Sequence, residues 1–492
     1  MTGNPDRLGV LDESFLIAEG PNAPLHVASV ALFEPDGLCD EHGLRLEAIR
    51  ARIAARLGLL PRLRQRIAHV PLGLARPVWV DDERFDIANH VDAVELGGTR
   101  DEAALLQLAE ELLMSPLDHD RPLWHLRFVT GLADGRVAVI QRTHHALVDG
   151  VSGVDVSLVL LDTEPNPPDA PPPDWTATPA PAPSALVASG LTDRVSATVG
   201  AAMRGASRLA HPRNLAHVAA DLGRTIGELR KAGLVAAPTS LNGPVGPSRQ
   251  LSLIRARLEE VRRAGSAHGA TVNDVVLTAV AGGLRQLFLA RGEPLPTDRV
   301  IKVLVPVSVR SDDQAMALGN RVGSLLAALP IGIGDPLARL RAVATTTSAL
   351  KRSSEAATVD VALQAADLLP PVVAHALQRS LNHQPLANLI VTNVPGPPFP
   401  LYALGSRMLE AFPVVPLGAN LTLEVAVLSY DGALNLGISS DRQACPDVDV
   451  FVRGVEEALR DLHVTWTPDT DRVPAAVDVT FGPAAGPGKG GG

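Results

Sequence analysis

A proline-rich stretch in the middle of the chain constrains its fold more than any other feature. Residues 164–183 read EPNPPDAPPPDWTATPAPAP, with nine prolines in twenty residues. Proline has no backbone N–H and its φ is fixed, so neither a helix nor a sheet continues through such a segment. We expect a semi-rigid linker there. Since the chain has 492 residues, the linker predicts two large folded parts, one on each side.

The composition around the linker divides the chain further. We expect a first lobe over residues 1–163, a linker with crossover helices over 164–238, a second lobe over 239–467, and a disordered tail over 468–492. The stretch from about residue 185 to 236 is helical in pattern and carries several arginines. Two interpretations of it stay open: a crossover helix between the lobes, or a helix that lies on a membrane surface.

Both halves alternate predicted strands with predicted helices. In the first half we expect strands over residues 25–33 and 136–143, a helix from Leu46 to Leu57, and a helix that runs from a Thr99–Glu102 capping box to about Met114. In the second half we expect a helix that begins at Thr271 and Asp274, a strand over 300–309, and strands over 421–429 and 433–439 joined by Asp431-Gly432. Recurring hairpin patterns favour mixed or antiparallel sheets, so the predicted class is α/β with two layered lobes.

Composition excludes several classes of protein. The formal net charge of −10 argues against a dedicated nucleic-acid binder, which would present a basic face. The two cysteines, Cys39 and Cys445, exclude a disulfide framework and a cysteine-rich zinc site. The sequence contains no run of about 18 apolar residues, so it predicts no helix that spans a membrane. The N-terminus lacks the pattern of a signal peptide. We therefore expect a cytoplasmic protein, with peripheral association with the inner face of the membrane left open.

The strongest chemical signal is the segment His144-His145-Ala146-Leu147-Val148-Asp149-Gly150, directly after a predicted strand. Tandem histidines can simply cap a strand and pack. A strand end also holds an imidazole rigidly, and a neutral imidazole can take a proton from a hydroxyl and return it to a leaving group. Asp149 has two possible partners, the imidazole or an arginine that braces the loop. Gly150 would allow a close turn or leave room for a substrate.

No protein nucleophile accompanies these histidines. The chain has no G-x-S-x-G segment, and neither cysteine lies near them in sequence. A lone base suggests direct attack of a bound hydroxyl or amine on an activated acyl group. Metal binding by His144 and His145 is the weaker idea, because adjacent side chains on an extended segment diverge. We therefore predict no metal site.

Several motifs together carry a resemblance to a known family. The HHxxxDG pattern at 144–150 resembles the signature of the CoA-dependent acyltransferase superfamily, which includes chloramphenicol acetyltransferase and the condensation domains of peptide synthetases. Four further segments resemble elements of the bacterial wax ester synthase/diacylglycerol acyltransferases: the opening at residues 11–30, Pro122-Leu123-Trp124, Asn273-Asp274, and Asn393-Val394-Pro395-Gly396-Pro397. These elements follow the family's order, so the resemblance covers most of the chain.

The resemblance implies a fold and an activity. The fold would consist of two chloramphenicol-acetyltransferase-like lobes with an active-site tunnel between them. The enzyme would move a fatty acyl group from acyl-CoA to the hydroxyl of a diacylglycerol, a long-chain alcohol, or both. No metal or prosthetic group would be needed, since acyl-CoA is a substrate. Lipid substrates would have to be reached from the surface of a membrane or a lipid droplet.

The resemblance also implies roles for individual residues. His145 would be the general base, and His144 would support the loop. Asp149 would turn away and pair with an arginine, for which Arg310 is the candidate. Supporting or lining roles would fall to Gly150, Asn273, Asp274, Trp124, Asn393, Pro395 and Gly396.

Some of these assignments stay open. Trp124 could line the acyl pocket or belong to the core. The segment from Asn393 could border the tunnel or form a turn only. The donor to the oxyanion is open between backbone N–H groups and a hydroxyl such as Ser308 or Thr392.

Two competing functions remain. One is acyl transfer to a different hydroxyl acceptor, such as a polyketide or a glycolipid. The other is a non-catalytic lipid-binding homologue that keeps the fold. The intact His145, Asp149 and Gly150 weigh against the second.

Overall fold

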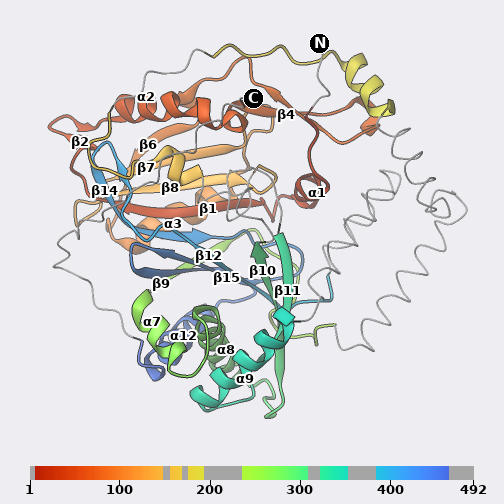
Figure 1. The fold of residues 1–492 in the computed structure, drawn as a ribbon, viewed down its shortest axis with the longest axis vertical. Coiled ribbons are helices and arrows are strands. Elements are labelled where there is room, and N and C mark those ends of the chain that lie inside the picture. The colour runs from red at the N-terminus through yellow and green to blue at the C-terminus, as the bar shows by residue number, and fades with distance from the viewer. Residues whose placement is uncertain are drawn as a thin grey trace, which may run out of the picture.

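Two six-stranded sheets lie face to face and form the two lobes of the molecule (Figure 1). The structure is a computed structural model, and it describes residues 6–147, 156–168, 175–192, 235–308, 322–352 and 384–464. The strand order is β13-β14-β1-β8-β7-β6 in the first sheet and β11-β10-β12-β15-β16-β9 in the second.

The first sheet combines strands from both ends of the chain. Its strands are β1 (His26–Phe33), β6 (Val91–Glu95), β7 (Trp124–Thr130), β8 (Val137–His144), β13 (Tyr402–Ala403) and β14 (Ser406–Val414). β6 and β7 are parallel, and the other pairs are antiparallel. The helices of this lobe are α1 (Val10–Ala18), α2 (Leu46–Arg56) and α3 (Glu102–Met114). Two short ribbons complete it: β2 (Cys39–Asp40) with β3 (Gly43–Leu44), and β4 (Gln65–Ala68) with β5 (Val78–Asp81).

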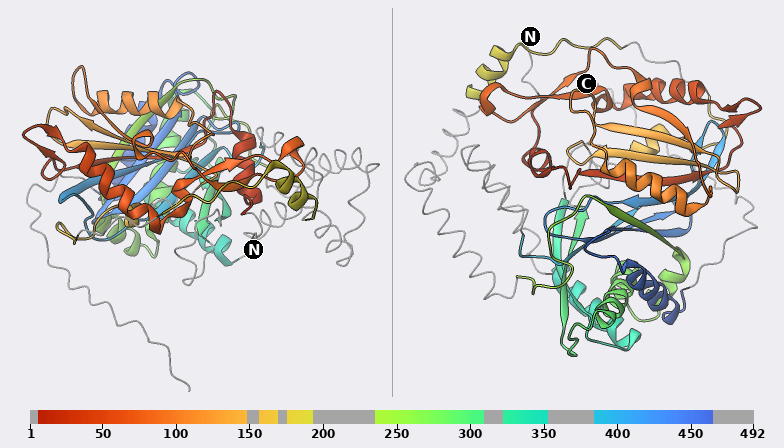
Figure 2. Two further views of the ribbon diagram at one scale, coloured as in Figure 1. Left: turned by 90° about the horizontal axis from the view of Figure 1, so that it is seen from above. Right: turned by 180° about the vertical axis from the view of Figure 1, so that it is seen from behind.

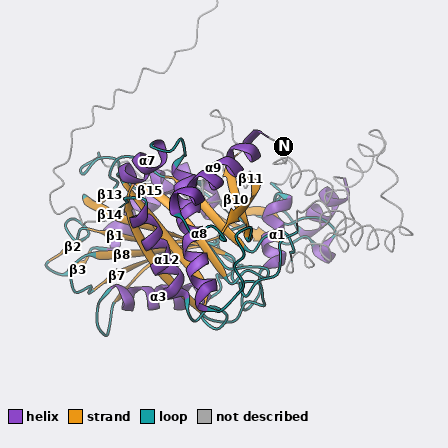
Figure 3. Cartoon of the chain, turned by 90° about the horizontal axis from the view of Figure 1, so that it is seen from below, coloured by secondary structure: helices purple, strands orange, loops and turns teal. Residues whose placement is uncertain are grey.

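The second sheet carries its helices on the face that turns away from the first lobe (Figures 1 and 3). Its strands are β9 (Arg249–Arg257), β10 (Val300–Ser308), β11 (Val322–Pro330), β12 (Leu389–Pro395), β15 (Leu423–Tyr430) and β16 (Ala433–Asp441). Its helices are α7 (Leu258–Ser266), α8 (Val272–Ala290), α9 (Pro336–Arg352) and α12 (Val448–Asp461). By length and composition α8 could cross a bilayer, but most of its side chains are buried in this core.

Local turn and cap chemistry explains the best-predicted elements. The predicted hairpin forms: Tyr430 pairs with Ala433, and Asp431 and Gly432 between them both have positive φ, as this two-residue turn requires. The predicted start of α8 is confirmed, with Thr271 and Asp274 in a reciprocal capping box. The mixed parallel and antiparallel pairing in both sheets confirms the expected α/β class.

The predicted cap of α3 is wrong. The N-cap residue is Asp101, whose side chain accepts a hydrogen bond from the backbone N–H of Ala104. A capping box of Thr99 and Glu102 would have placed the cap two residues earlier. Aspartate is at least as good an N-cap as threonine, so the later position is taken.

The lobes do not divide at one point in the chain. β13 and β14 belong to the predicted second lobe at 239–467, but β14 pairs with β1 and completes the first sheet. β14 and β16 cross so closely that a Cβ atom on Gly437 would lie 1.8 Å from the carbonyl oxygen of Pro413. Arg255 of β9 also links the two lobes, through ion pairs with Glu102 of α3 and Glu410 of β14.

The described part of the proline-rich linker is docked on the first lobe. Its residues 175–182 form neither helix nor strand. Trp175 lies under the guanidinium of Arg64 and edge-on to Phe85. Residues 169–174, most of the predicted crossover helices and the predicted tail from 468 lie outside the described residues.

Candidate active site

The two histidines of the motif lie where β8 ends. His144 is the last residue of the strand and pairs with His26 of β1. The backbone is held on both sides, since the N–H of His144 donates to the carbonyl of Leu123 at 2.9 Å and that of His145 to Leu25 at 2.8 Å. The chain then turns, with the N–H of Leu147 donating to the carbonyl of His144. The motif is therefore built on a rigid strand end, as predicted.

The His145 side chain is half-buried, and an aromatic ring covers one of its faces. The ring of Phe15, on α1, stacks on it with centroids 3.9 Å apart and planes 12° from parallel. This contact limits rotation of the imidazole about its χ angles. His145 thus combines a fixed backbone, a fixed ring plane and partial exposure, so its imidazole is held in one orientation.

His144 is fully buried, and its hydrogen bonds define its tautomer. Its Nδ1 accepts a hydrogen bond from the backbone N–H of Ala146 at 3.0 Å, so in the neutral ring the proton sits on Nε2. That Nε2 faces the carboxylate of Glu19, with 3.7 Å between Nε2 and Oε2. The arrangement braces the turn that carries His145, and the supporting role expected for His144 stays a prediction.

Glu19 also pairs with a second histidine. The Nε2 atom of His119 lies 2.9 Å from the Oε2 atom of Glu19. Burial raises the pKa of Glu19, but the hydrogen bond to His119 and the nearby His144 outweigh it, and the pKa of Glu19 falls far below the usual value. The same hydrogen bond raises the pKa of His119. The charges of Glu19 and His119 therefore stabilise each other beside the buried His144.

The cluster of Glu19, His119 and His144 has the composition of a metal site, since one ligand atom from each lies within 4.8 Å of the others. Its hydrogen bonding does not suit a metal. A histidine that binds a metal through Nε2 normally donates its Nδ1–H to a neighbour. Here Nδ1 of His144 accepts a hydrogen bond from Ala146 instead. The adjacent His144 and His145 rings also have different neighbours, Glu19 and Phe15, so they do not converge on one ion.

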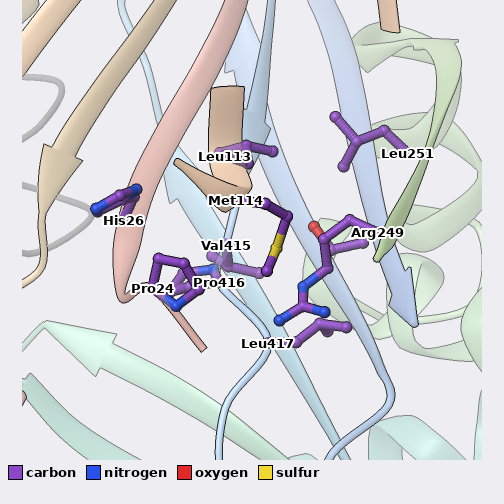
Figure 4. A pocket seen from close by; sticks show the side chains of 10 residues that line it. Pro24, His26, Leu113, Met114, Arg249, Leu251, Val415, Pro416 and Leu417 are labelled. Carbon is purple, nitrogen blue, oxygen red and sulfur yellow. The ribbon is translucent and has the colours of Figure 1, made fainter. Parts of the chain in front are cut away.

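A narrow pocket lies beside His26, the residue of β1 that pairs with His144 (Figure 4). His26 contributes to it, and its side chain is 1% exposed, with neither ring nitrogen hydrogen-bonded within the described part of the chain. Burial and the nearby charges of His144 and Arg142 lower the pKa of His26 to about 3, so the ring is neutral. Arg249 and Ser439 of the second sheet line the opposite wall. The cavity volume is about 10 Å³, which leaves room for one water molecule at most.

Two of the predicted elements meet in the second lobe. Asn273, in the first turn of α8, accepts a hydrogen bond through Oδ1 from the side-chain amide of Asn393 on β12, at 3.4 Å. Asp274 is buried and accepts hydrogen bonds from the N–H and hydroxyl of Thr271 and from the hydroxyl of Thr347. All of these bonds stabilise α8 and its neighbours, so the structure assigns Asp274 a place in the fold rather than in the chemistry.

β12 ends in the segment that begins at Asn393, and the backbone of this segment lies close to the backbone of β15. Pro395 is exposed and pairs with Ser429 of β15. The N–H of Gly396 donates to the hydroxyl of Ser429 at 3.2 Å, and a Cβ atom on Gly396 would lie 2.2 Å from the Ser429 carbonyl oxygen. Only glycine fits there, so packing alone accounts for this residue.

Trp124 lies in the core of the first lobe. Its side chain is 3% exposed and its indole N–H donates to the carbonyl of Leu63 at 2.7 Å. Its ring stacks on His90, with centroids 4.7 Å apart. Of the two interpretations left open for Trp124, these contacts support the core position.

Three predicted site residues, Asp149, Gly150 and Arg310, lie outside the described residues. Of the two hydroxyl candidates for the oxyanion, Ser308 ends β10 and Thr392 lies on β12. Their roles remain predictions.

Sequence reasoning missed Glu19, His119, His26 and Phe15. Three of them lie within residues 11–30, the opening segment that was noted without roles for its side chains. His119 lies in the loop before β7. The only signal in the sequence was that three of them lie in a segment already matched to a motif, which does not tell which side chains converge.

Comparison with known proteins identifies the family. The sequence profile of the wax ester synthase/diacylglycerol acyltransferase catalytic domain matches residues 8–276, more than half of the chain, and that of the WS/DGAT C-terminal domain matches residues 318–463. The chain belongs to this family. Two proteins of Mycobacterium tuberculosis named as diacylglycerol O-acyltransferases are 33% and 30% identical to it, and each alignment covers 93% of this chain and 90% or more of the relative.

Solved structures agree with the two-lobed fold. The wax ester synthase/diacylglycerol acyltransferase from Marinobacter aquaeolei VT8 aligns with a TM-score of 0.67 over 93% of this chain and 98% of that one, at 24% identity. The first condensation domain of the calcium-dependent antibiotic synthetase aligns with a TM-score of 0.58 over 94% of this chain and 96% of that one, at 18% identity. Membership makes this chain an O-acyltransferase of the diacylglycerol acyltransferase and wax ester synthase type, which confirms the activity expected from its motifs.

Proposed function

We propose that this enzyme transfers a fatty acyl group from acyl-CoA to the hydroxyl of a diacylglycerol, a long-chain alcohol, or both, with His145 as the general base. The observation that carries the proposal is the placement of His145. It stands at a strand end, its ring is fixed against Phe15, and it keeps partial exposure to solvent.

The proposed reaction proceeds through a tetrahedral intermediate. His145 takes the proton of the acceptor hydroxyl as the hydroxyl oxygen attacks the thioester carbon. The carbonyl oxygen becomes an oxyanion, which needs hydrogen-bond donors nearby. The intermediate then collapses, the carbon–sulfur bond breaks, and the protonated His145 returns its proton to the leaving CoA thiolate. The proton is conserved over the cycle, so no prosthetic group is required.

The residues around His145 would serve its orientation. Phe15 would hold the ring plane, and the hydrogen bond that His144 accepts from Ala146 would hold the turn. Asp149 and Arg310 keep their proposed role as a pair that braces the same loop. None of these side chains needs to touch the substrate.

We further propose that the enzyme acts at the inner face of a membrane or at a lipid droplet, in contact with the cytoplasm. Its proposed acceptors are lipids that partition out of water. The proposal predicts that turnover with a long-chain acceptor depends on the amount of lipid surface in the assay as well as on the amount of enzyme.

Release of CoA with a panel of acceptors tests the proposed function. Long-chain acyl-CoA is supplied with dioleoylglycerol, with hexadecanol, with a polyketide or glycolipid alcohol, or with no acceptor. We expect acceptor-dependent release with one or both of the first two. Turnover only with the third would instead favour the alternative acceptor class. No turnover with any acceptor would favour a non-catalytic homologue.

A further inference from the structure

His119 lies beside the candidate active site, but the proposed reaction gives it no part. It stands in the loop before β7, and its ring lies edge-on to that of His144, with centroids 5.7 Å apart. Its Nε2 atom lies 2.9 Å from Oε2 of Glu19, and the same oxygen lies 3.7 Å from Nε2 of His144. Glu19 directly follows α1, which lies at the end of the first sheet where β8 ends (Figures 1 and 2). Three separate segments therefore bring two histidines to one carboxylate oxygen.

The turn after β8 requires His144 to stay neutral. The backbone N–H of Ala146 donates a hydrogen bond to Nδ1 of His144 at 3.0 Å, and a ring nitrogen that carries a proton cannot accept one. A second proton on the ring would therefore set two donors against each other. Because this hydrogen bond closes the turn that contains His145, its loss would release the backbone that holds the proposed base.

Glu19 by itself would favour the charged form of His144. Burial raises the pKa of this carboxyl, but the adjacent histidines lower it far more, so Glu19 is ionised. An ionised carboxylate at such a distance from an imidazole favours the imidazolium form. The side chains of Glu19 and His144 are 14% and 0% exposed, so water screens the attraction little. The neutral state of His144 therefore needs a further charge that offsets the carboxylate.

His119 supplies that charge. The hydrogen bond to Glu19 outweighs the burial of the His119 ring and raises its pKa. Asp118 and Asp120 of the same loop act in the same direction, and Asp118 also pairs with Arg121. With His119 charged, Glu19 and His119 form a neutral pair. The proton that the carboxylate attracts then sits on the half-exposed ring and not on the buried one.

The other groups near His144 do not offset Glu19. His26 pairs with His144 across β1 and β8, and burial with the neighbouring charges lowers its pKa to about 3, so its ring is neutral. The guanidinium of Arg142 turns to the end of α3, where it donates to two backbone carbonyls. Within the part of the chain that the structure describes, His119 is then the only side chain that contacts Glu19 as a cation.

We propose that His119 is a positioning residue of the acyl transfer: its charge neutralises Glu19, keeps His144 neutral, and so keeps the turn that carries His145 in place. His119 touches no substrate. The proposal rests on the proposed role of His145, but the protonation of His144 can be followed without turnover. Loss of His119 should harm the enzyme on the acidic side of its pH range, and the defect should fade as rising pH removes the extra proton from His144.

The pH dependence of CoA release by the full chain tests the proposal. His119→Gln removes the cation, and His119→Arg keeps a cation at every pH of the assay. A double variant, His119→Gln with Glu19→Gln, removes both charges of the pair. The matched control is His42→Gln, because His42 faces Glu41 in an exposed pair of the same kind, with 3.5 Å between Nε2 and Oε1.

We expect the acidic limb of the kcat profile of His119→Gln to lie about one pH unit above that of the wild type, since an unneutralised carboxylate favours the imidazolium by about that much. The variant should be up to about tenfold slower on this limb and should approach the wild-type rate at higher pH. His119→Arg and the double variant should keep the wild-type limb, because their carboxylate is neutralised or gone. His42→Gln should keep it as well.

The ring ¹⁵N signals of His144 give a second readout that needs no turnover. The two nitrogens of a neutral imidazole differ strongly in chemical shift, and those of an imidazolium are similar. The signals are assigned by their absence in His144→Asn, in which the side-chain oxygen can still accept from Ala146. We expect the wild-type ring to be neutral with its proton on Nε2 at about pH 6, and the ring in His119→Gln to pass to the imidazolium form there.

A His119→Gln profile that is lowered by one factor at every pH would overturn the proposal, since a merely structural defect behaves in this way. A His144 ring that stays neutral in His119→Gln would overturn it too. A shifted limb in His119→Arg would do the same, which keeps the proposal open to test if His119→Gln does not fold. If the wild type shows no turnover, the proposed function fails, while the ¹⁵N titration still decides the state of His144.

Discussion

Phe15 stacks on the imidazole of His145, with ring centroids 3.9 Å apart and ring planes 12° from parallel. The contact joins α1, near the start of the described chain, to the strand end that carries the proposed base. We expect Phe15→Ala to lower kcat about 10- to 100-fold, because an unsupported ring spends less time aligned with the acceptor hydroxyl. Phe15→Tyr, which keeps the ring, should restore most of the rate. Equal rates for both variants and the wild type in an assay of CoA release would contradict the stacking role.

The pair of Glu19 and His119 predicts a pH-dependent stability. The pKa of Glu19 is lowered, so its contribution is present above the ordinary value of 4.5 and is lost as the pH falls through the depressed value. The pKa of His119 is raised, so its contribution is present below 6.5 and is lost as the pH rises through the elevated value. The pair should therefore stabilise the protein most between these two ordinary values.

Glu19→Gln measures this contribution. We expect it to lower the free energy of unfolding by about 1–2 kcal/mol near pH 5.5, the range for one partly exposed, charge-assisted hydrogen bond. The loss should become smaller as the pH rises through the elevated pKa of His119, where the imidazole gives up its charge. The control is Glu457→Gln on the exposed face of α12. A difference between Glu19→Gln and the wild type that is constant with pH, by urea unfolding, would show that the pair is not ionised as described.

Because Asp274 is buried and hydrogen-bonded within the fold, we expect its substitution to lower stability without a specific effect on catalysis. Its carboxylate caps α8 through Thr271 and accepts the hydroxyl of Thr347. Asp274→Ala should lower the free energy of unfolding by about 2–3 kcal/mol, from a lost cap and a lost hydrogen bond between two buried side chains. Urea unfolding measures the loss. The kcat of the fraction that remains folded should stay within a few-fold of the wild type, and a far larger fall would place Asp274 in the chemistry.

The close crossing of the two sheets at Gly437 predicts that no larger residue is accepted there. A Cβ atom would lie 1.8 Å from the carbonyl oxygen of Pro413, and both partners are backbone in strands. Gly437→Ala should lower the free energy of unfolding by about 2 kcal/mol or more, because the lobes must separate to relieve the clash. Gly97→Ala is the control, since nothing lies within 4 Å of the added atom. Equal melting temperatures for the two variants would contradict this packing.

Elements with local signals could be predicted from the sequence. The Asp431-Gly432 hairpin and the Thr271–Asp274 cap depend on turn and cap chemistry within a few residues, and both form as expected. The cap of α3 was misplaced because Asp101 and Thr99 are both good N-cap residues, and the sequence does not rank them.

Long-range pairing could not be predicted in the same way. Nothing in the alternation of residues 406–414 indicates that β14 pairs with β1 in the first sheet rather than within the second. The site shows the same limit. His145 was found because its motif is continuous in sequence. Phe15 and Glu19 come to the two histidines from the opening segment and His119 from the loop before β7, and only the fold brings these segments together.

The rate of CoA release by His145→Ala tests the central claim most directly. The assay uses long-chain acyl-CoA with the acceptor that the wild type prefers, and His268→Ala, at an exposed histidine of the second lobe, is the matched control. We predict that His145→Ala lowers kcat about 10²- to 10⁴-fold, the usual contribution of one general base, while His268→Ala leaves it unchanged. A His145→Ala enzyme that is folded and turns over at the wild-type rate would contradict the account.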